Sequence, residues 1–532
     1  MSDGASNRGK LMWASFLTLI AAGMGFAVRG GVLAEWSDNF GFTQFELGTI
    51  TGGGLLGFGI VIMLASLITD HVGYKPILMT AFALHLLSAL ITISATPIFN
   101  AAGKDATYQC LYWGMFMFAV ANGLCEAVIN PLVATVYREK KTHYLNILHA
   151  GWPGGLIIGG LLGAAIVGKV PWEIPIALYI IPTLWYGFIV LKEPFPTSDA
   201  KRAGLTFGGM LSQFASPLLL FLLLLHACVG YVELGTDSWI TNITESILTG
   251  QGFFLFVYAS SIMFILRFFA GPIVERINPL GLLCLSTILG TTGLYLLGSV
   301  KAAALVWIAV TIYGVGKTFL WPTMLGIVGE RFPRGGAITM GAMGGIGMLS
   351  AGLLGGPGIG YKQDLNASNQ LKGGHPETYT RYAAAKEDGF LMFPKVKGLD
   401  GQKVGVLLDS GGPAATLNSD HEILVEQGEP IPPSIANLKQ WWDSTGSEYQ
   451  EVDREPVEQA RIYGGRKALQ WTAVVPAAMF FGYLLLVIYF RTQGGYRTVE
   501  IDSEGHAHLT DHKPTAEEAI EDGEEGLTSG QA

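Results

Sequence analysis

The chain has 532 residues, of which 50% are hydrophobic and only 14% are charged, whereas roughly 25% of the residues in an average soluble domain are charged. Its mean hydropathy is +0.40 and its formal net charge is −9. Apolar runs of about 20 residues, long enough to cross a bilayer, recur along the chain. This composition excludes a collagen, a disulfide-rich scaffold, a disordered chain and a basic nucleic-acid-binding protein. It predicts an all-α polytopic membrane protein.

The negative charge is concentrated near the C-terminus. The chain has 42 acidic and 33 basic side chains, and residues 500–525 hold ten of the acidic ones and a single lysine. The rest of the chain therefore carries 32 of each sign and is neutral. A block of like charge is typical of a solvated, disordered tail. All four cysteines lie within apolar runs, which favours buried thiols over disulfides.

Twelve apolar runs are long enough to span a membrane. They cover residues 11–34, 46–69, 76–96, 108–136, 144–168, 173–191, 216–241, 253–274, 280–300, 303–329, 336–358 and 467–490. The first run continues past the length of a signal peptide's apolar region, so we expect it to be retained. Lysines and arginines concentrate in alternate loops, beginning with Arg8 and Lys10. The positive-inside rule then places both termini in the cytoplasm, and the expected location is the cell's inner membrane.

Two polar segments interrupt these runs. The first predicts a cytoplasmic connector between two bundles of six helices. The second is over 100 residues long, and we expect a partly folded insertion with a short strand pair around Val404–Leu408 and a helical piece near Trp441 and Trp442. The predicted organisation is an N-terminal bundle (1–191), a connector (192–215), five helices of a C-terminal bundle (216–358), an extracytoplasmic insertion (359–466), helix 12 (467–490) and an acidic cytoplasmic tail (491–532).

An internal repeat supports the division into two bundles. The spacing of Gly123–Pro131 in the fourth run recurs as Gly314–Pro322 in the tenth, at an offset of 191 residues. Gly160–Gly163 in the fifth run recurs as Gly352–Gly355 in the eleventh, at an offset of 192. Parallel repeats of this kind are typical of a transporter architecture whose binding site lies between the halves at the middle of the membrane.

A short motif follows the second run. The segment Asp70-His-Val-Gly-Tyr-Lys75 resembles the signature between helices 2 and 3 of the major facilitator superfamily. The resemblance implies the major facilitator fold, with twelve transmembrane helices in two pseudo-symmetric six-helix bundles, and a gating latch on the cytoplasmic side. The residues it assigns to gating are Asp70, Gly73 and Lys75, together with Glu275 and Arg276 at the matching place after the eighth run.

Three further segments resemble, more narrowly, the fucose:proton symporter family and its glucose-transporting relatives. They are Gly123–Pro131, Leu145–His149 and Glu233–Trp239, in the fourth, fifth and seventh runs. The resemblance implies proton-coupled sugar transport. Where that family has an acidic residue in helix 1, this chain has Gly30 or Gly31, with Arg29 beside it.

Charged residues within the apolar runs are candidates for proton coupling, because each costs roughly 2.5–3.5 kcal/mol to insert. Glu126 and Lys317 occupy equivalent positions in the two repeats, so we expect them to face each other across the central cavity. Moving the cation away would let the carboxylate take up a proton. A static ion pair is the alternative. Arg29 is the third candidate, with either an acidic partner, Glu126 among them, or a substrate anion.

Sugars bind through amide and carboxylate groups and through aromatic rings that pack on the apolar ring face. Candidate substrate-binding residues are Asn130, Asn146, His149, Trp152, Glu233, Trp239 and Trp321. For each tryptophan, packing or an interfacial position is the alternative. His149 is also a candidate proton relay. Arg267, near the cytoplasmic end of its run, is assigned a structural role.

The sequence therefore predicts a secondary active transporter that moves a sugar or a related small polar solute by alternating access. The expected mechanism is proton symport, and sodium is the alternative coupling ion. We expect a monomer in the lipid bilayer, without enzymatic activity, cofactor, metal or nucleic-acid partner. One alternative is an organic-anion or sugar-acid transporter in which Arg29 and Lys317 bind the carboxylate. A second alternative is a non-transporting receptor that uses residues 359–466.

Overall fold

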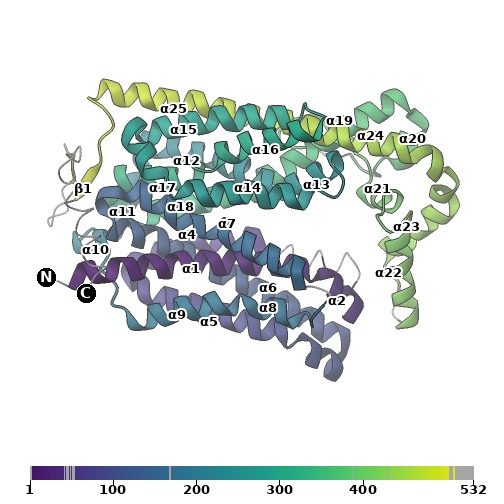
Figure 1. Ribbon diagram of the computed structural model, residues 1–532, viewed down its shortest axis with the longest axis horizontal. Coiled ribbons are helices and arrows are strands. Elements are labelled where there is room, and N and C mark those ends of the chain that lie inside the picture. Colours follow the sequence, from purple (N-terminus) through teal and green to yellow (C-terminus); the bar gives the residue numbers. More distant parts are fainter. Residues whose placement is uncertain are drawn as a thin grey trace.

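The computed structural model describes residues 3–40, 42, 47, 50, 54–166, 169–387, 389–428, 430–501 and 507–509. Nearly all secondary structure within them is helical. Figure 1 shows two bundles of roughly parallel helices lying side by side, with both ends of the described part of the chain at one end and a smaller lobe at the other.

The N-terminal bundle forms from the first half of the chain. Its helices are α1 (Asp3–Gly31), α2 (Leu33–Phe40), α4 (Gly54–Val72), α5 (Tyr74–Ile93), α6 (Ala95–Val136), α7 (Lys141–Ile166), α8 (Glu173–Leu178) and α9 (Ile180–Lys192), with a 3-10 turn η1 (Arg138–Lys140). Helix α6 is kinked at Gly103, where φ is +79° and glycine alone avoids strain. The start of the second predicted span lies largely outside the described residues.

The connector and the C-terminal bundle follow. The segments are α10 (Asp199–Arg202), α11 (Phe207–Leu211), η2 (Ser212–Ala215), α12 (Pro217–Gly230), η3 (Tyr231–Gly235), α13 (Thr236–Ile247), α14 (Gly252–Arg267), α15 (Ala270–Leu297), α16 (Ala303–Lys317), α17 (Leu320–Arg331), η4 (Pro333–Gly335), α18 (Gly336–Ser350) and η5 (Ala351–Gly355). Within the described residues, ten helical segments are long and apolar enough to cross a membrane, and two shorter apolar helices, Gly57–Val72 and Gly252–Arg267, fall on the second and eighth predicted spans. Each of the twelve predicted spans thus falls on a helical segment.

Two short π-helical segments, η3 and η5, which are called π-turns below, interrupt the seventh and eleventh spans and pack against each other. Gly235 and Gly355 approach so closely that a Cβ atom on either would collide with the backbone of the other. Just beyond the turns, the indole Nε1 of Trp239 donates a hydrogen bond to the carbonyl of Gly356, 2.9 Å away. The halves of these two spans nearer the lobe are therefore joined.

The segment from 359 to 466 folds into the lobe at the end opposite the termini (Figure 1). It consists of α19 (Gly356–Gly374), α20 (Pro376–Tyr382), α21 (Gly401–Leu407), α22 (Ala415–Glu426), α23 (Pro433–Trp441), η6 (Trp442–Gly446) and α24 (Ser447–Thr472), which leads into α25 (Val474–Thr492). Tyr382, Val457 and Trp442 belong to its own apolar core. Helices α19 and α24 pass without a break through the predicted boundaries at 359 and 466, so the lobe rests on extensions of helices 11 and 12.

The strand pair expected around Val404–Leu408 is wrong, because this segment forms helix α21. The carboxylate of Asp400 accepts hydrogen bonds from the N–H groups of Gln402 and Lys403 and caps the helix. The helix expected near Trp441 and Trp442 is confirmed by α23 and η6.

After α25 the chain returns to the end that holds the N-terminus. Strands β1 (Val499–Ile501) and β2 (Ala507–Leu509) form a small antiparallel pair, with Glu500 opposite His508. The hydroxyl of Tyr496 donates a hydrogen bond to Glu330 at 2.6 Å and so fixes the chain against α17. Most of the predicted acidic tail, residues 502–506 and 510–532, lies outside the described residues.

Candidate functional site

A chain of polar side chains links α6 and α7 in the N-terminal bundle. Glu126 is buried, and its Oε2 accepts a hydrogen bond of 2.7 Å from the amide of Asn130 one turn later. The amide oxygen of Asn130 in turn lies 2.9 Å from Nε2 of His149. The three predicted residues are thus brought together, and Glu126 is held by a neutral group.

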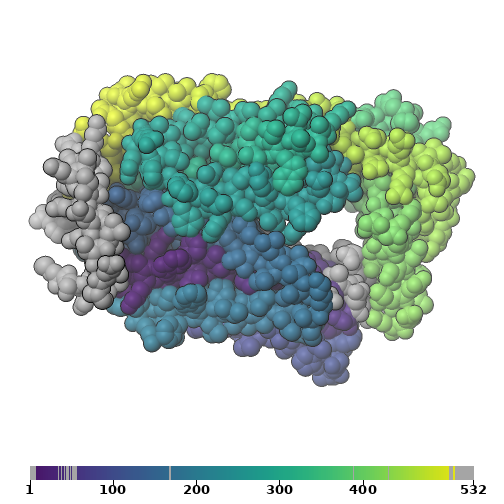
Figure 2. Space-filling view, in the orientation of Figure 1, coloured from purple at the N-terminus to yellow at the C-terminus, as the bar shows by residue number. Residues whose placement is uncertain are grey.

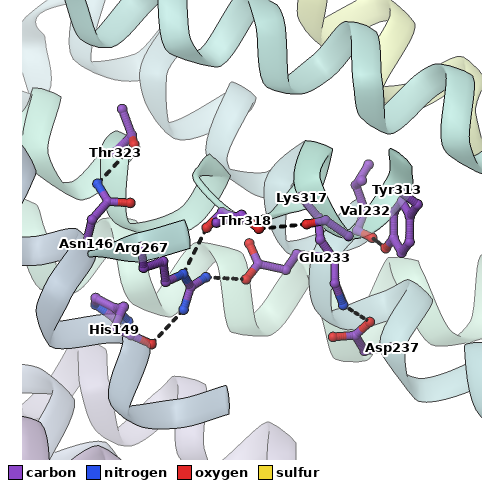
Figure 3. Close-up of polar contacts among 11 residues, drawn as sticks. Asn146, His149, Val232, Glu233, Asp237, Arg267, Tyr313, Lys317, Thr318 and Thr323 are labelled. Atoms are coloured by element: carbon purple, nitrogen blue, oxygen red, sulfur yellow. Dashed lines mark hydrogen bonds and ion pairs between the residues drawn. The ribbon is translucent and has the colours of Figure 1, made fainter. Parts of the chain in front are cut away.

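Arg267, the last residue of α14, is only 3% exposed and contacts residues of both bundles (Figure 3). Its Nη2 donates to Oε1 of Glu233 at 2.9 Å, its Nε to the carbonyl of Thr318 at 2.8 Å and its Nη1 to the carbonyl of His149 at 2.6 Å. The last of these bonds crosses from one bundle to the other. The sequence analysis assigned Arg267 a structural role near the cytoplasmic end and did not anticipate these contacts.

The expected contact between Glu126 and Lys317 does not form. Lys317 is 1% exposed, and its Nζ lies 2.5 Å from Oδ1 of Asp237 in its own bundle (Figure 3). The reason is that α13 begins directly after the π-turn η3 and presents Asp237 at the end of α16, so the lysine has a nearer carboxylate than Glu126. Asp237 keeps 20% of its side chain exposed.

Arg29 does not pair with Glu126 either. Its guanidinium lies 4.0 Å from the ring centre of Phe118 and 4.6 Å from that of Tyr179. Nη2 donates to the hydroxyls of Ser88 and Tyr179, at 2.8 and 3.1 Å. No carboxylate of the described residues forms an ion pair with it. Aromatic faces and hydroxyl groups stabilise this buried cation in place of an acidic partner.

The remaining candidates have different surroundings. The amide nitrogen of Asn146 donates to the carbonyl of Thr142 and, at 3.2 Å, to the hydroxyl of Thr323 in the other bundle. Trp321 is buried against His226, with 4.6 Å between ring centres. Trp152 is half-buried against Phe26. Trp239, as described above, holds α13 to α19.

Several buried polar atoms near the centre have no hydrogen-bond partner among the described residues. They include Oε2 of Glu233, Oδ1 of Asn146 and both ring nitrogens of His226. Asn146 and Glu233 lie on either side of Arg267 in Figure 3. Buried polar atoms without partners are costly, so such a cluster indicates a place where a polar ligand supplies the missing hydrogen bonds.

At the end that carries the termini, hydrogen bonds also join the bundles. Oδ2 of Asp70 accepts a bond of 2.8 Å from the N–H of Ala337 at the start of α18. The hydroxyl of Thr142 donates to Glu330 at 2.6 Å. Figure 2 shows the bundles in contact over this part and an opening at the opposite end, beside the lobe. The molecule is therefore closed at the end of the termini.

The other predicted gating residues lie near this closure. Gly73 has φ +92° in the turn between α4 and α5, a conformation that favours glycine. Nζ of Lys75 donates to the carbonyls of Leu191 and Glu193 within its own bundle. Glu275 and Arg276 are exposed on the first part of α15. Their gating role stays a prediction.

Comparison with known proteins gives one family and several relatives. The family model described as Major Facilitator Superfamily matches residues 15–356. The L-fucose-proton symporter of Escherichia coli (strain K12) is 26% identical over 137 residues, which are 26% of this chain and 30% of that protein. The chain thus matches less than a third of the length of this curated relative.

Solved structures resemble the fold over a longer stretch. FucP, a transporter of this superfamily in the outward conformation, superposes with a TM-score of 0.56 at 18% identity, over 66% of this chain and 91% of that one. The proton:xylose symporter XylE, bound to 6-bromo-6-deoxy-D-glucose, gives 0.59 at 13% identity over 69% and 91%. A bacterial homologue of the human lysosomal transporter Spinster, inward-facing and unoccupied, gives 0.54 at 13% identity over 90% and 96%.

Proposed function

Since the chain belongs to the Major Facilitator Superfamily and is a multi-pass membrane transporter, we propose that its cargo is a sugar, carried together with a proton by alternating access. The observation that carries the proposal is the set of buried polar atoms without partners on Glu233 and Asn146, which lie on either side of Arg267, and on His226, which packs against Trp321. A hydroxyl-rich molecule can both donate to the carboxylate and amide oxygens and bond the imidazole. The relatives named for fucose and xylose symport support the same cargo class.

The balance of buried charge favours a neutral cargo. The six charged candidates within the apolar runs are three carboxylates, Glu126, Glu233 and Asp237, and three cations, Arg29, Arg267 and Lys317. Two of the cations already have carboxylate partners, and the third is enclosed by rings and hydroxyl groups. An acidic cargo would add a charge to a balanced site, so the organic-anion alternative is less well supported.

Glu126 is the proposed proton carrier, because a neutral amide and not a cation holds it. When ionised, the carboxylate accepts the N–H of Asn130. When protonated, it can donate to the oxygen of a rotated Asn130 amide, whose N–H₂ then faces Nε2 of His149. This nitrogen accepts only in the tautomer that carries its proton on Nδ1, so protonation of Glu126 is coupled to a tautomer change of His149 on α7, the helix that Arg267 contacts from the other bundle.

The orientation follows from the distribution of lysine and arginine. We propose that the end with both termini faces the cytoplasm, that the lobe lies outside the cell's inner membrane and that the monomer is the working unit. The state described here is then closed to the cytoplasm.

The test is substrate-triggered proton entry. Energy-depleted, lightly buffered cells that express the protein would receive neutral hexoses, deoxyhexoses, disaccharides and sugar acids while the external pH is followed. We expect a neutral sugar to cause alkalinisation. The response should be lost in Glu126→Gln and kept in the control variant Glu193→Gln, because the carboxylate of Glu193 binds Lys10 at the surface. A response to acids alone would support the organic-anion alternative, and a response that requires sodium would mean that sodium and not the proton is the coupling ion.

A second experiment addresses the receptor alternative. Because α19 and α24 pack side by side, with Gly464 against Ala367, a short linker can replace residues 375–446 without separating the two helices. We expect sugar uptake to persist in this variant. Complete loss of uptake with normal amounts of protein in the membrane would favour a function located in the lobe.

A further inference from the structure

Two backbone carbonyls near the centre lack a helical partner because of prolines. In an α-helix the carbonyl of residue i accepts the N–H of residue i+4, and proline has no N–H. Pro153 therefore leaves the carbonyl of His149 in α7 free, and Pro322 leaves that of Thr318, just before α17. A buried carbonyl without a donor is destabilising, so each requires a partner from elsewhere.

Arg267 supplies the donor for both. Its Nη1 lies 2.6 Å from the oxygen of His149 and its Nε 2.8 Å from that of Thr318. The third bond, to Glu233, fixes the guanidinium between them. An arginine has five N–H donors in a rigid planar fork and so can serve several acceptors at once (Figure 3).

The two proline-freed contacts differ in what they join. Thr318 and Glu233 belong to the same bundle as Arg267, whereas His149 belongs to the other. The bond to His149 must therefore break when the bundles separate at this level. Its acceptor lies on α7, the helix that also carries Lys141 and Thr142 of the cytoplasmic closure, where they bond to Gly329 and Glu330 of the other bundle.

We propose that Arg267 is a clasp that stabilises the state closed to the cytoplasm, and that Pro153 creates the clasp's acceptor on the opposite bundle. Arg267 is a positioning residue in this role. The inference rests on the proposed function through alternating access, and it adds the specific contact whose release accompanies opening.

The test compares two proline substitutions that act on the same guanidinium. Pro153→Ala gives the carbonyl of His149 a helical N–H and weakens the bond between the bundles. Pro322→Ala does the same for Thr318, within one bundle. The readout is the rate at which a maleimide labels Ala134→Cys, a buried position on α6 whose Cβ faces Gly329 of the other bundle in the cytoplasmic closure, relative to the chain without that cysteine.

We expect Pro153→Ala to raise the labelling rate about fivefold and Pro322→Ala to leave it within twofold. Equal rates for the two variants, raised or unchanged, would overturn the proposal. The readout requires neither sugar nor proton, so its failure leaves the proposed symport intact, and a failure of the symport assay leaves the clasp intact.

A coupling experiment separates the clasp from a change in the stiffness of α7. In the double variant Arg267→Gln/Glu233→Gln no guanidinium is present, so adding Pro153→Ala should not change the labelling rate further. A fivefold increase in this background as well would mean that the proline acts through its helix alone, and the proposal would be wrong. If the double variant does not fold, the comparison of the two prolines decides.

Discussion

The two bundles hold their buried charges in opposite ways. In the N-terminal bundle, Arg29 contacts rings and hydroxyl groups and Glu126 contacts an amide, so neither has an ionic partner among the described residues. In the C-terminal bundle each buried cation has a carboxylate partner, Glu233 or Asp237. The internal repeat in the sequence is therefore seen in the arrangement of the helices, but the partners of the buried charged residues differ between the two bundles.

This difference assigns different tasks to the two halves. Two opposite charges in contact within a poorly polarisable interior stabilise each other's ionised form. Glu126 has no cation within ion-pair distance among the described residues, and Arg267 attracts it only from further away, so it is less constrained and can gain or lose a proton while its hydrogen bonding rearranges. We infer that the N-terminal bundle holds the titrating group and that the C-terminal bundle provides fixed charges.

The largest effect is expected from breaking the fully buried pair. Arg267→Gln leaves the carboxylate of Glu233 buried without a cation, which should cost about 3–5 kcal/mol in the free energy of unfolding. Thermal unfolding of the purified protein in detergent measures this loss. The double variant Arg267→Gln/Glu233→Gln should recover the part of the loss that comes from the unpaired carboxylate, but not the part that comes from the lost donors to His149 and Thr318. Equal destabilisation of the single and double variants would contradict the pairing.

A smaller loss is expected at the second pair. Lys317→Met leaves Asp237 without its partner, but this carboxylate is 20% exposed and water can solvate it in part, so the cost should be about 2 kcal/mol. The same unfolding measurement applies, with Lys317→Met/Asp237→Asn as the compensating variant. A loss as large as that of Arg267→Gln would show that exposure does not relieve the charge.

In the N-terminal bundle, Arg29→Lys keeps the charge and removes the planar group that lies against Phe118 and Tyr179. The expected cost is about 1 kcal/mol, because a compact ammonium packs less well on two rings. Urea unfolding followed by tryptophan fluorescence would measure it. A loss above 3 kcal/mol would contradict the small cost expected for exchanging one cation for another at this site.

The smallest effect is expected for Glu126→Gln, less than about 1 kcal/mol, since the amide oxygen of glutamine can accept the same bond from Asn130. Its counterpart Glu233→Gln leaves Arg267 without a carboxylate and should destabilise several times more. Comparing the two glutamine variants in one unfolding series tests the contrast directly. If they destabilise equally, Glu126 is not an unpaired group.

The sequence predicted the fold because each apolar run determines a helix by itself, and the offset of 191 residues between Gly123–Pro131 and Gly314–Pro322 marked the two halves. It did not predict the partner of Lys317. The repeat suggested Glu126, whereas the π-turn η3 sets where the helix beyond it begins and brings Asp237 to the lysine, and neither hydropathy nor repeat spacing reveals a π-turn.

Arg267 was missed for a related reason. The sequence does contain a signal, since Pro153 and Pro322 each mark a carbonyl four residues earlier that needs a donor. Which side chain supplies that donor depends on how α14 packs against α7 and α17. Proline-freed carbonyls within apolar runs are thus a sequence feature to search for, together with any arginine in a neighbouring run.

The unbroken passage of α19 and α24 from the bundle into the lobe has a practical consequence for imaging and single-molecule work. The lobe is joined to the C-terminal bundle by these two continuous helices, and α22 at its far end reaches toward the side of the N-terminal bundle (Figure 1). Because α22 lies at the far end of the lobe, a tilt of the C-terminal bundle moves α22 through a larger distance than the bundle itself. A fluorophore or antibody fragment on this helix would report the rocking of a transporter whose membrane part is otherwise hidden in detergent.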